Sequence, residues 1–281
     1  MPIQFKVIQG DIVVEQHANK PTVYLDNWAF NTFALKEELS KKFTKIMNDK
    51  TSTLAFSIMN LVEITNRADN QQIDNIVNFI DSIDGIFIDV NPQDVIKREK
   101  DYKKRGITHI SPCADVGLLR VNFLIAHNLL RPFRISEVIL KLRDEIKITN
   151  YVLTEQHFEQ SLYPIVLKAR ADNKVLERAR KRFKQKIECT YPCTQQIFTK
   201  CIDFIALNKN MRMPNKEWCD VFNLIVPVAY CDFVLADARW TTFIHGLKFK
   251  MSCIAKVYNC NQIEQFFEDL KNYEDDKARG G

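Results

Sequence analysis

Four acidic residues lie where one secondary-structure element is expected to give way to the next. Asp26 ends the apolar run TVYL, and Asp237 ends the run FVLA. Glu63 lies just inside the helix expected after LAFSIMN, and Asp220 lies in the first turns of the helix expected in NKEWCDVFNLIV. In an open α/β sheet, the carboxyl ends of strands and the adjoining helix starts meet at one edge. We therefore expect these four carboxylates to lie close together.

Such a group of carboxylates calls for a cation. Carboxylates that are forced together repel one another and raise one another's pKa. Carboxylate and water oxygens suit Mg²⁺ or Mn²⁺, which also bind substrate phosphates. Two such ions would stabilise both the attacking and the leaving oxygen of an in-line displacement. The four acids therefore predict metal-dependent hydrolysis of phosphodiester bonds.

The segments that carry these acids resemble the successive acidic motifs of a PIN-domain nuclease, in the order YLDNWAF, LAFSIMNLVEITN and EWCDVFNLIVPVAYCDFVLAD. The resemblance covers residues 20–92 and 213–260. It implies a central parallel sheet flanked by helices, and acidic residues that hold Mg²⁺ or Mn²⁺ for cleavage of RNA or sometimes DNA. Carried over residue by residue, the metal-binding and catalytic roles fall to Asp26, Glu63, Asp220 and Asp237.

Two further acids lie near this set. Glu217 precedes Asp220 by three residues, shares its helix face and could replace it as the third acid. Asp232 lies five residues before Asp237, and we expect it at the opposite end of the same strand.

Other polar residues beside the acids are secondary candidates. The family often has a hydroxyl residue near the metal after the last acid, and the resemblance gives that part to Thr241 or Thr242. Arg239 is a candidate phosphate contact. Asn27 directly follows Asp26 and could cap the next helix in its place.

Each acid also has an ordinary structural interpretation. Asp26 could cap the helix that follows it, and Asp237 could be a turn residue before Ala-Arg-Trp. Glu63 could be a solvated helix residue, and Asp220 could complement a helix dipole, an effect of about 0.3 to 1 kcal/mol. We favour one shared site because four unrelated roles would then have to occur in the family's order by accident.

The elements that position these acids follow from the pattern of apolar residues. Strands and helices alternate in the first third of the chain, which is typical of α/β proteins. The predicted strands are 4–8, 12–14, 21–26, the start of 52–69 and 85–92, and strands return at 231–237 and 251–258. The predicted helices of this part are 31–49, the rest of 52–69 and 72–83.

Between these halves, residues 94–212 are predicted to be helix after helix. Ser111-Pro112 is a good helix start. Further helices are predicted at 136–148, 155–188 and 194–208. The predicted fold is therefore α/β, with a PIN-like central parallel sheet flanked by helices and a large all-helical insertion. Its parts are the split nuclease domain at 1–92 and 213–270, the insertion at 93–212 and a flexible tail at 271–281.

Positive charge is concentrated in the predicted insertion. The chain carries 40 Lys and Arg against 35 Asp and Glu, but residues 168–186 hold nine cations against two acids and residues 97–105 hold six against two. A solvated helix face is the ordinary interpretation. Such clusters also attract polyanions, because phosphate contacts supply most non-specific nucleic-acid affinity. The predicted nucleic-acid contacts are Arg178, Arg180, Lys181, Arg182 and Arg239.

Several other classes of protein are poorly supported. The eight Cys residues are scattered and show no zinc-ligand spacing. The chain contains no GxxxxGK[ST] or GxGxxG motif for nucleotides. No leader pattern and no apolar run long enough to cross a bilayer is present, so we expect a cytoplasmic protein without a membrane partner.

The sequence therefore predicts a metal-dependent endonuclease that acts on RNA in preference to DNA. The family resemblance implies a toxin or defence effector that an inhibitor or antitoxin protein silences, and it leaves a homo-oligomer open. The alternative is a catalytically inactive PIN-like protein that binds nucleic acid or a partner through its helical block.

Overall fold

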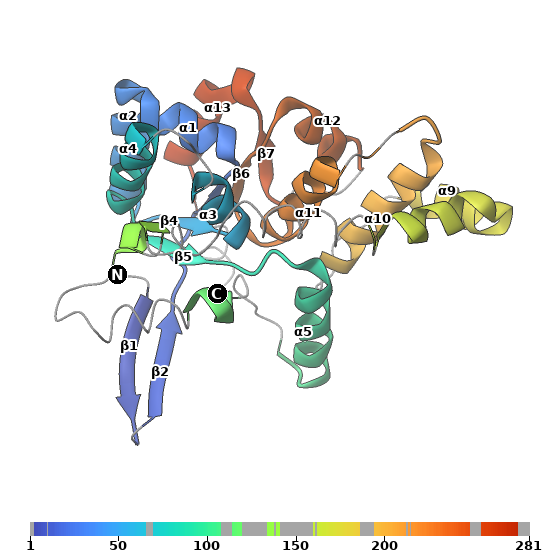
Figure 1. Ribbon diagram of the computed structural model, residues 1–281, viewed down its shortest axis with the longest axis horizontal. Coiled ribbons are helices and arrows are strands. Elements are labelled where there is room, and N and C mark those ends of the chain that lie inside the picture. The colour runs from blue at the N-terminus through green and yellow to red at the C-terminus, as the bar shows by residue number, and fades with distance from the viewer. Residues whose placement is uncertain are drawn as a thin grey trace.

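The centre of the protein is a five-stranded parallel sheet with the strand order β5-β4-β3-β6-β7 (Figure 1). The structure is a computed structural model and describes residues 3–9, 11–65, 70–107, 114–119, 134–137, 139–140, 160, 162–185, 194–211, 213, 215–247 and 254–274. The strands are β3 (Thr22–Leu25), β4 (Thr53–Phe56), β5 (Gly85–Phe87), β6 (Phe233–Leu235) and β7 (Lys256–Tyr258). The prediction of an α/β protein with a parallel sheet flanked by helices is confirmed.

Helices cover both faces of this sheet, which is why its strands are short and almost wholly apolar. Val23 and Leu25 pack into one core, and Tyr24 between them packs into the other. The first core includes α1 (Asn27–Leu35), α2 (Glu37–Asp49), α4 (Asn70–Asp81) and α13 (Ile263–Lys271). The second core includes α10 (Thr194–Leu207), α11 (Asn215–Tyr230) and α12 (Ala238–Gly246). Figure 1 shows the first group to the left and the second group to the right.

Two of the predicted helices are divided in the structure. The predicted helix 31–49 begins earlier, at Asn27, and Lys36 interrupts it with an extended backbone (φ −104°, ψ 98°). Within 155–188, a helix over 162–171 ends before Asp172, and α9 (Asn173–Lys184) follows. The Asp172 carboxylate accepts hydrogen bonds from the backbone of Lys174 at 2.8 Å and of Val175 at 3.3 Å, so it caps α9. Apolar residues continue at helical spacing across both interruptions, so periodicity alone predicts single helices.

An antiparallel hairpin of β1 (Ile3–Ile8) and β2 (Asp11–Gln16) projects from the body of the protein (Figure 1). The predicted strands at 4–8 and 12–14 are thereby confirmed. The Gln16 side-chain amide donates to the carbonyl of Phe87 and accepts from its N–H, both at 2.9 Å. The base of the hairpin is therefore joined to the outer edge of β5.

Close packing at the start of β5 requires glycine. A Cβ atom on Gly85 would lie 2.3 Å from Cδ1 of Ile135 and 2.6 Å from Cε2 of Phe56, distances that no side chain tolerates. Leu54 and Gly85 are partners in the β4–β5 register. The absence of a side chain therefore lets the helix turn that carries Ile135 approach the sheet.

The helices predicted between β5 and β6 are only partly described. They include α5 (Pro92–Lys104), α9, α10 and α11, whereas Ser111-Pro112 and 141–148 lie outside the described residues. Most of the predicted tail, 275–281, also lies outside them. Within the described part of the chain, no helix has the length and apolar character needed to span a bilayer.

Candidate functional site

The two central strands of the sheet form its topological switch point. From β3 the chain builds one half outward through β4 and β5, and from β6 it builds the other half through β7. Leu25 and Leu235 are partners in the register of β3 and β6. Ligands in open α/β sheets bind in the crevice at the carboxyl ends of such strands. Asp26 directly follows β3 and Asp237 follows β6 after Ala236, so both acids lie at this crevice.

Asp26 combines a capping role with this position. Its Oδ1 atom accepts a hydrogen bond of 2.9 Å from the backbone N–H of Asn27, at the start of α1. Its own N–H donates to the carbonyl of Leu235 at 2.9 Å, which extends the β3–β6 pairing by one bond. The carboxyl group is thus fixed between the end of the sheet and the N-terminus of a helix.

Asp237 caps α12 in the same manner. Its Oδ1 atom accepts from the backbone N–H groups of Arg239 at 3.1 Å and Trp240 at 3.2 Å. The N-termini of α1 and α12 therefore both point to the carboxyl edge of the sheet. Helix N-termini carry partial positive charge and free N–H groups, so they stabilise these carboxylates and also favour anionic ligands.

Asp220 lies close enough to Asp26 to change its titration. Burial raises the pKa of Asp26 from the usual 3.8 to about 7, and the charges of Asp220 and Asp237 add to the rise. Hydrogen bonding from the backbone of Asn27 and of Asp237 opposes it. The structure therefore brings three of the four predicted acids within electrostatic range of one another.

Glu63 lies at the same edge on α3 (Ile58–Thr65), the short helix after β4. Burial raises the pKa of the neighbouring Tyr24, and the charges of Asp26 and Glu63 raise it further. The Asn60 side chain donates to the carbonyl of Leu25 at 3.1 Å, which fixes the start of α3 at the end of β3. Glu63 on α3 and Asp26 after β3 are therefore both close enough to Tyr24 to raise the pKa of its hydroxyl group.

The oxygen-rich donor set fits a hard cation, although the side chains are not arranged around one. No group of three or more His, Cys, Asp or Glu side chains among the described residues could hold a metal ion as it stands. Two buried oxygens beside the acids, Oδ1 of Asn27 and Oε2 of Glu217, accept no hydrogen bond from any described residue. Carboxylate and amide oxygens are the ligands that Mg²⁺ and Mn²⁺ prefer. Metal binding would require the carboxylates to rotate toward one another.

Comparison with known proteins adds no relative. No family model, no curated protein and no solved structure matches this chain. Its function must therefore be argued from the geometry and charge of its own residues.

An ion pair joins the two helices that carry Asp220 and Asp237. Oε1 of Glu217 on α11 accepts a hydrogen bond from Nη1 of Arg239 on α12. The Arg239 guanidinium also lies 5.1 Å from the centre of the Trp240 ring. The predicted phosphate contact Arg239 is thus held beside Asp237 by the predicted alternative acid Glu217.

The hydroxyl groups of the two Thr residues after Asp237 donate hydrogen bonds to backbone carbonyls. Thr241 is only 1% exposed, and its hydroxyl donates to the carbonyl of Asp237 at 2.9 Å. The Thr242 hydroxyl donates to the carbonyl of Ala238 at 2.8 Å. Such bonds to the preceding turn are common for Thr in helices. The metal role predicted for either hydroxyl stays a prediction.

Asp232 lies at the opposite edge of the sheet, as the sequence predicts. Its Oδ2 atom accepts from the backbone N–H of Thr22 at 2.8 Å and from the Thr22 hydroxyl at 3.0 Å, at the start of β3. This acid therefore joins the amino ends of β3 and β6 and takes no part in the candidate site.

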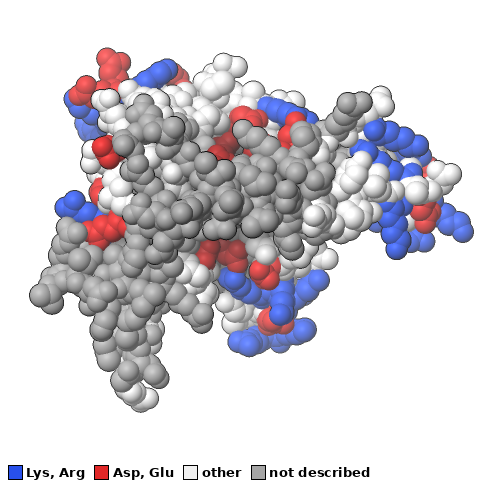
Figure 2. Space-filling model, viewed as in Figure 1, with Lys and Arg blue, Asp and Glu red and all other residues white. Residues whose placement is uncertain are grey.

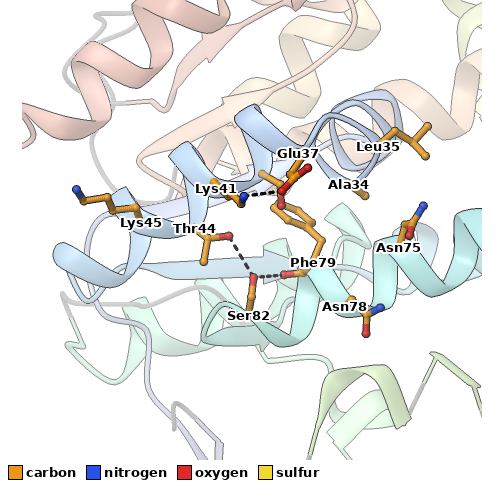
Figure 3. A pocket seen from close by; sticks show the side chains of 11 residues that line it. Ala34, Leu35, Glu37, Lys41, Thr44, Lys45, Asn75, Asn78, Phe79 and Ser82 are labelled. Atoms are coloured by element: carbon orange, nitrogen blue, oxygen red, sulfur yellow. Dashed lines mark hydrogen bonds and ion pairs between the residues drawn. The ribbon is translucent and has the colours of Figure 1, made fainter.

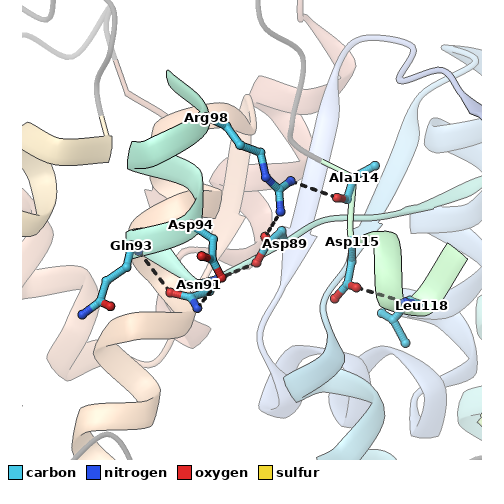
Figure 4. A network of polar contacts seen from close by, with 8 residues as sticks. All are labelled: Asp89, Asn91, Gln93, Asp94, Arg98, Ala114, Asp115 and Leu118. Atoms are coloured by element: carbon cyan, nitrogen blue, oxygen red, sulfur yellow. Dashed lines mark hydrogen bonds and ion pairs between the residues drawn. The ribbon is translucent and has the colours of Figure 1, made fainter. Parts of the chain in front are cut away.

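A second acidic group follows β5, and the sequence interpretation overlooked it (Figure 4). Nη2 of Arg98 on α5 donates to Oδ2 of Asp89 at 2.5 Å, and Nη1 donates to the carbonyl of Ala114 at 3.2 Å. Burial raises the pKa of Asp89, Arg98 opposes this rise, and Asp115 and Asp94 add to it. The sequence signal was present, because Asp89 ends the apolar run GIFI as Asp26 ends TVYL.

The four cations predicted on α9 lie at the right-hand end of the view in Figure 1, with α10 and α11 between them and the sheet. Arg178, Arg180, Lys181 and Arg182 are all exposed. Arg180 forms an ion pair with Glu177 on the same helix. Arg182 makes a two-pronged contact with Asp203 of α10, at 2.8 and 2.6 Å. This segment therefore packs against α10, and α10 and α11 lie between it and the acidic site.

A surface hollow of about 680 Å³ lies elsewhere, between α2, α4 and the end of α1 (Figure 3). None of the predicted site residues lines it. Lys41 pairs with Glu37 at 2.5 Å on one wall, and the Thr44 and Ser82 hydroxyls lie 3.1 Å apart across it. The first contact lies within α2, whereas the second joins α2 to the end of α4, and nothing among the lining residues resembles a catalytic arrangement.

Proposed function

We propose that this chain is a PIN-like, Mg²⁺- or Mn²⁺-dependent endonuclease that hydrolyses phosphodiester bonds and prefers RNA to DNA. The observation that carries the proposal is the placement of Asp26 and Asp237 after the two strands of the switch point. Asp220 supports it, because this acid is close enough to raise the pKa of Asp26. The order of the acidic motifs in the sequence supports it independently.

Each acidic residue at the carboxyl edge would have its own role in metal binding. Asp26, Asp220 and Asp237 would hold the metal, with Glu63 completing the set from α3 and Glu217 and Asn27 offering further oxygens. When bound, the ion lowers the pKa of water and offsets charge on the phosphate. The caps keep Asp26 and Asp237 at the carboxyl edge of the sheet, and the side-chain rotation that metal binding requires would have to break or share these capping bonds.

The chain also offers groups for the substrate itself. The N-termini of α1 and α12 favour a phosphate at the carboxyl edge. Arg239 would exchange part of its contact with Glu217 for a phosphate oxygen, because a guanidinium can bind both in a planar geometry. The expectations of a toxin or defence role, an inhibitor partner and a cytoplasmic location rest on the family resemblance and the sequence pattern alone.

Cleavage assays test the proposal. Purified protein is incubated with labelled single-stranded RNA and with DNA of the same sequence, in millimolar Mn²⁺ or in chelator. We expect RNA cleavage that requires the metal. Asp26→Asn and Asp237→Asn should each slow it by roughly 10³-fold, about 4 kcal/mol in the barrier, because each removes a charged ligand from the reacting centre.

Asp89→Asn is the matched control, since it removes another strand-end carboxylate from the same edge. It should change the rate by less than about threefold. Equal cleavage by the wild type, Asp26→Asn and Asp237→Asn would sink the nuclease assignment. Absence of cleavage together with a persistent gel shift would favour the inactive nucleic-acid-binding alternative.

A further inference from the structure

The net charge of the protein is concentrated on one helix. The twelve residues of α9 include six Lys or Arg and a single Glu, a net charge of +5. The whole chain of 281 residues also has a net charge of +5. The remainder of the chain is therefore balanced, and α9 is the dominant positive feature of the molecule. Figure 2 shows this group of Lys and Arg side chains over α9 at the right, with a smaller group over α5 below.

Three of these cations form a stripe on the outer face of α9. Lys174, Arg178 and Lys181 follow one another at spacings of four and three residues, which places them on one side of a helix. Leu176 and Ala179 are buried on the other side. At 1.5 Å per residue the stripe is about 10 Å long. Among the described residues, none of these three cations has an ion-pair partner.

The helix that carries the stripe is firmly docked. Arg182 is held by the two-pronged contact with Asp203 of α10. The buried Lys200 of α10 donates to the carbonyl of Gln185 at the end of α9, at 2.8 Å, and to that of Leu247 at the end of α12, at 3.0 Å. Two cations are thus used to fix α9 in place, while Lys174, Arg178 and Lys181 remain directed outward.

The character of the stripe favours nucleic acid over protein as its ligand. Protein interfaces depend on buried aromatic or apolar residues at their centre. No large apolar side chain is exposed on α9. Three large apolar residues are exposed on the preceding helix and not on α9, namely Tyr163, Ile165 and Leu167. Regularly spaced cations on a helix face that exposes no large apolar side chain instead suit a phosphate backbone, whose binding depends mainly on charge.

We infer that α9 is a second nucleic-acid contact, separate from the cleavage site, and that the preferred substrate is an RNA long enough to reach both. This inference rests on the proposed nuclease function. The α9 helix packs on α10, and α10 packs on α11, which carries Asp220. Two helix-to-helix steps of about 8 to 10 Å separate α9 from α11 by roughly 20 Å. At about 3.4 Å per nucleotide along a duplex strand, a substrate must extend for at least about six nucleotides to bridge them.

The test compares two triple variants that remove the same charge. Lys174→Gln, Arg178→Gln and Lys181→Gln together remove the stripe. Lys36→Gln, Lys45→Gln and Lys271→Gln remove three exposed lysines at the other end of the protein and serve as the control. Binding of an RNA hairpin of about 20 base pairs is measured in chelator over a series of salt concentrations, by fluorescence anisotropy.

The stripe variant should bind the hairpin at least about tenfold more weakly at 0.1 M salt, with a salt dependence shallower by about 2 to 3 in log–log slope. The control triple should bind as the wild type does. In the presence of Mn²⁺, the preference for the hairpin over a strand of about three nucleotides, which is too short to bridge the two contacts, should fall at least about tenfold in the stripe variant. Equal hairpin binding by all three proteins would overturn the inference even if the wild type cleaves RNA.

Other outcomes separate this inference from the nuclease proposal. If no protein cleaves RNA but only the stripe variant loses hairpin binding, the second contact stands and the nuclease function fails. If both triples lose binding equally, net charge alone explains the affinity and the inference is wrong. Stripe-dependent binding to anionic lipid vesicles, without binding to the hairpin, would also overturn it.

Discussion

Two strand-end carboxyl groups at the same edge of the sheet have different electrostatic surroundings. After β5, Asp89 is paired with Arg98 at 2.5 Å. After β3 and β6, Asp26 and Asp237 have no ion pair with any described Lys or Arg, and the negative charges of Asp220 and Asp237 act on Asp26. Burial raises the pKa of both Asp26 and Asp89, but a guanidinium of the chain offsets the charge of only one. The comparison separates a strand-end carboxylate whose charge is balanced within the fold from one whose charge is not, and under the proposed function only the second would bind a metal.

The largest expected difference between Asp26 and Asp89 is in the stability that the protein gains from bound metal. At a Mn²⁺ concentration of 100 times the dissociation constant, the free energy of unfolding of the wild type should rise by about 2.7 kcal/mol. Asp89→Asn should keep this gain, and Asp26→Asn should lose most of it. Thermal unfolding with Mn²⁺ and with chelator measures both. If Mn²⁺ stabilised Asp26→Asn but not Asp89→Asn, the metal would bind at Asp89 and not at Asp26.

Removal of Arg98 should show that the group after β5 depends on its internal cation. Asp89 is 14% exposed at its side chain, so Arg98→Met should lower the free energy of unfolding by about 2 kcal/mol at pH 7. Arg239→Met is the matched control, because Arg239 is 49% exposed and its pair with Glu217 should contribute less than about 1 kcal/mol. Urea denaturation measures both losses. If the two substitutions cost the same, the Arg98 pair has no special structural role.

The smallest effect expected is a dependence of stability on pH. The pKa of Asp26 rises from 3.8 to about 7 on folding, so the native state binds a proton more tightly than the unfolded chain. Its contribution to stability is therefore lost as pH rises from about 4 to about 7. Asp26→Asn removes the charge but keeps a capping side chain. A rise in pKa of this size would correspond to about 4 kcal/mol for a fully buried group. Because Asp26 is only half-buried, solvent screening reduces this, and in chelator Asp26→Asn should exceed the wild type in stability by roughly 1 to 2 kcal/mol at pH 8 and by much less near pH 4.

Denaturant unfolding at several pH values checks this prediction. Asp89→Asn provides the contrast, because it gives up the pair with Arg98 and should gain no stability at pH 8. An Asp26→Asn protein that is less stable than the wild type at pH 8 would show that the carboxylate is already neutralised within the fold.

Local sequence was sufficient for the strands and for the acids that end them. The runs TVYL, TLAF and FVL are rich in β-branched, aromatic or leucine residues, and a polar residue follows each run directly or after one alanine, so the strands could be predicted. Strand direction also placed Asp232 at the opposite edge from Asp237. A carboxylate at a given end of a strand is a local property, which is why this part of the prediction holds.

The remaining features depend on tertiary contacts. Lys36 and Asp172 interrupt helices whose apolar spacing continues, because docking of each helix outweighs weak residue preferences. Asp89 was overlooked because its partner Arg98 lies nine residues away on the next helix, and only the fold shows that the two meet. The separation between α9 and the acids is likewise invisible in a sequence, where charge can be counted but not placed.

Gln16 has a consequence for how the protein meets its neighbours. The N–H and carbonyl of Phe87 face outward from β5, and an added strand would pair with those two groups. A glutamine amide offers the same donor and acceptor as a peptide unit, so one side chain occupies both. Another chain that tries to extend the sheet at this border must first displace Gln16. Ala114 shares this border and forms a β-bridge with Ile88. The N–H of Asp115 also donates to the carbonyl of Phe87, at 3.2 Å. Together with Gln16 they cover the β5 border against pairing with the edge of another sheet.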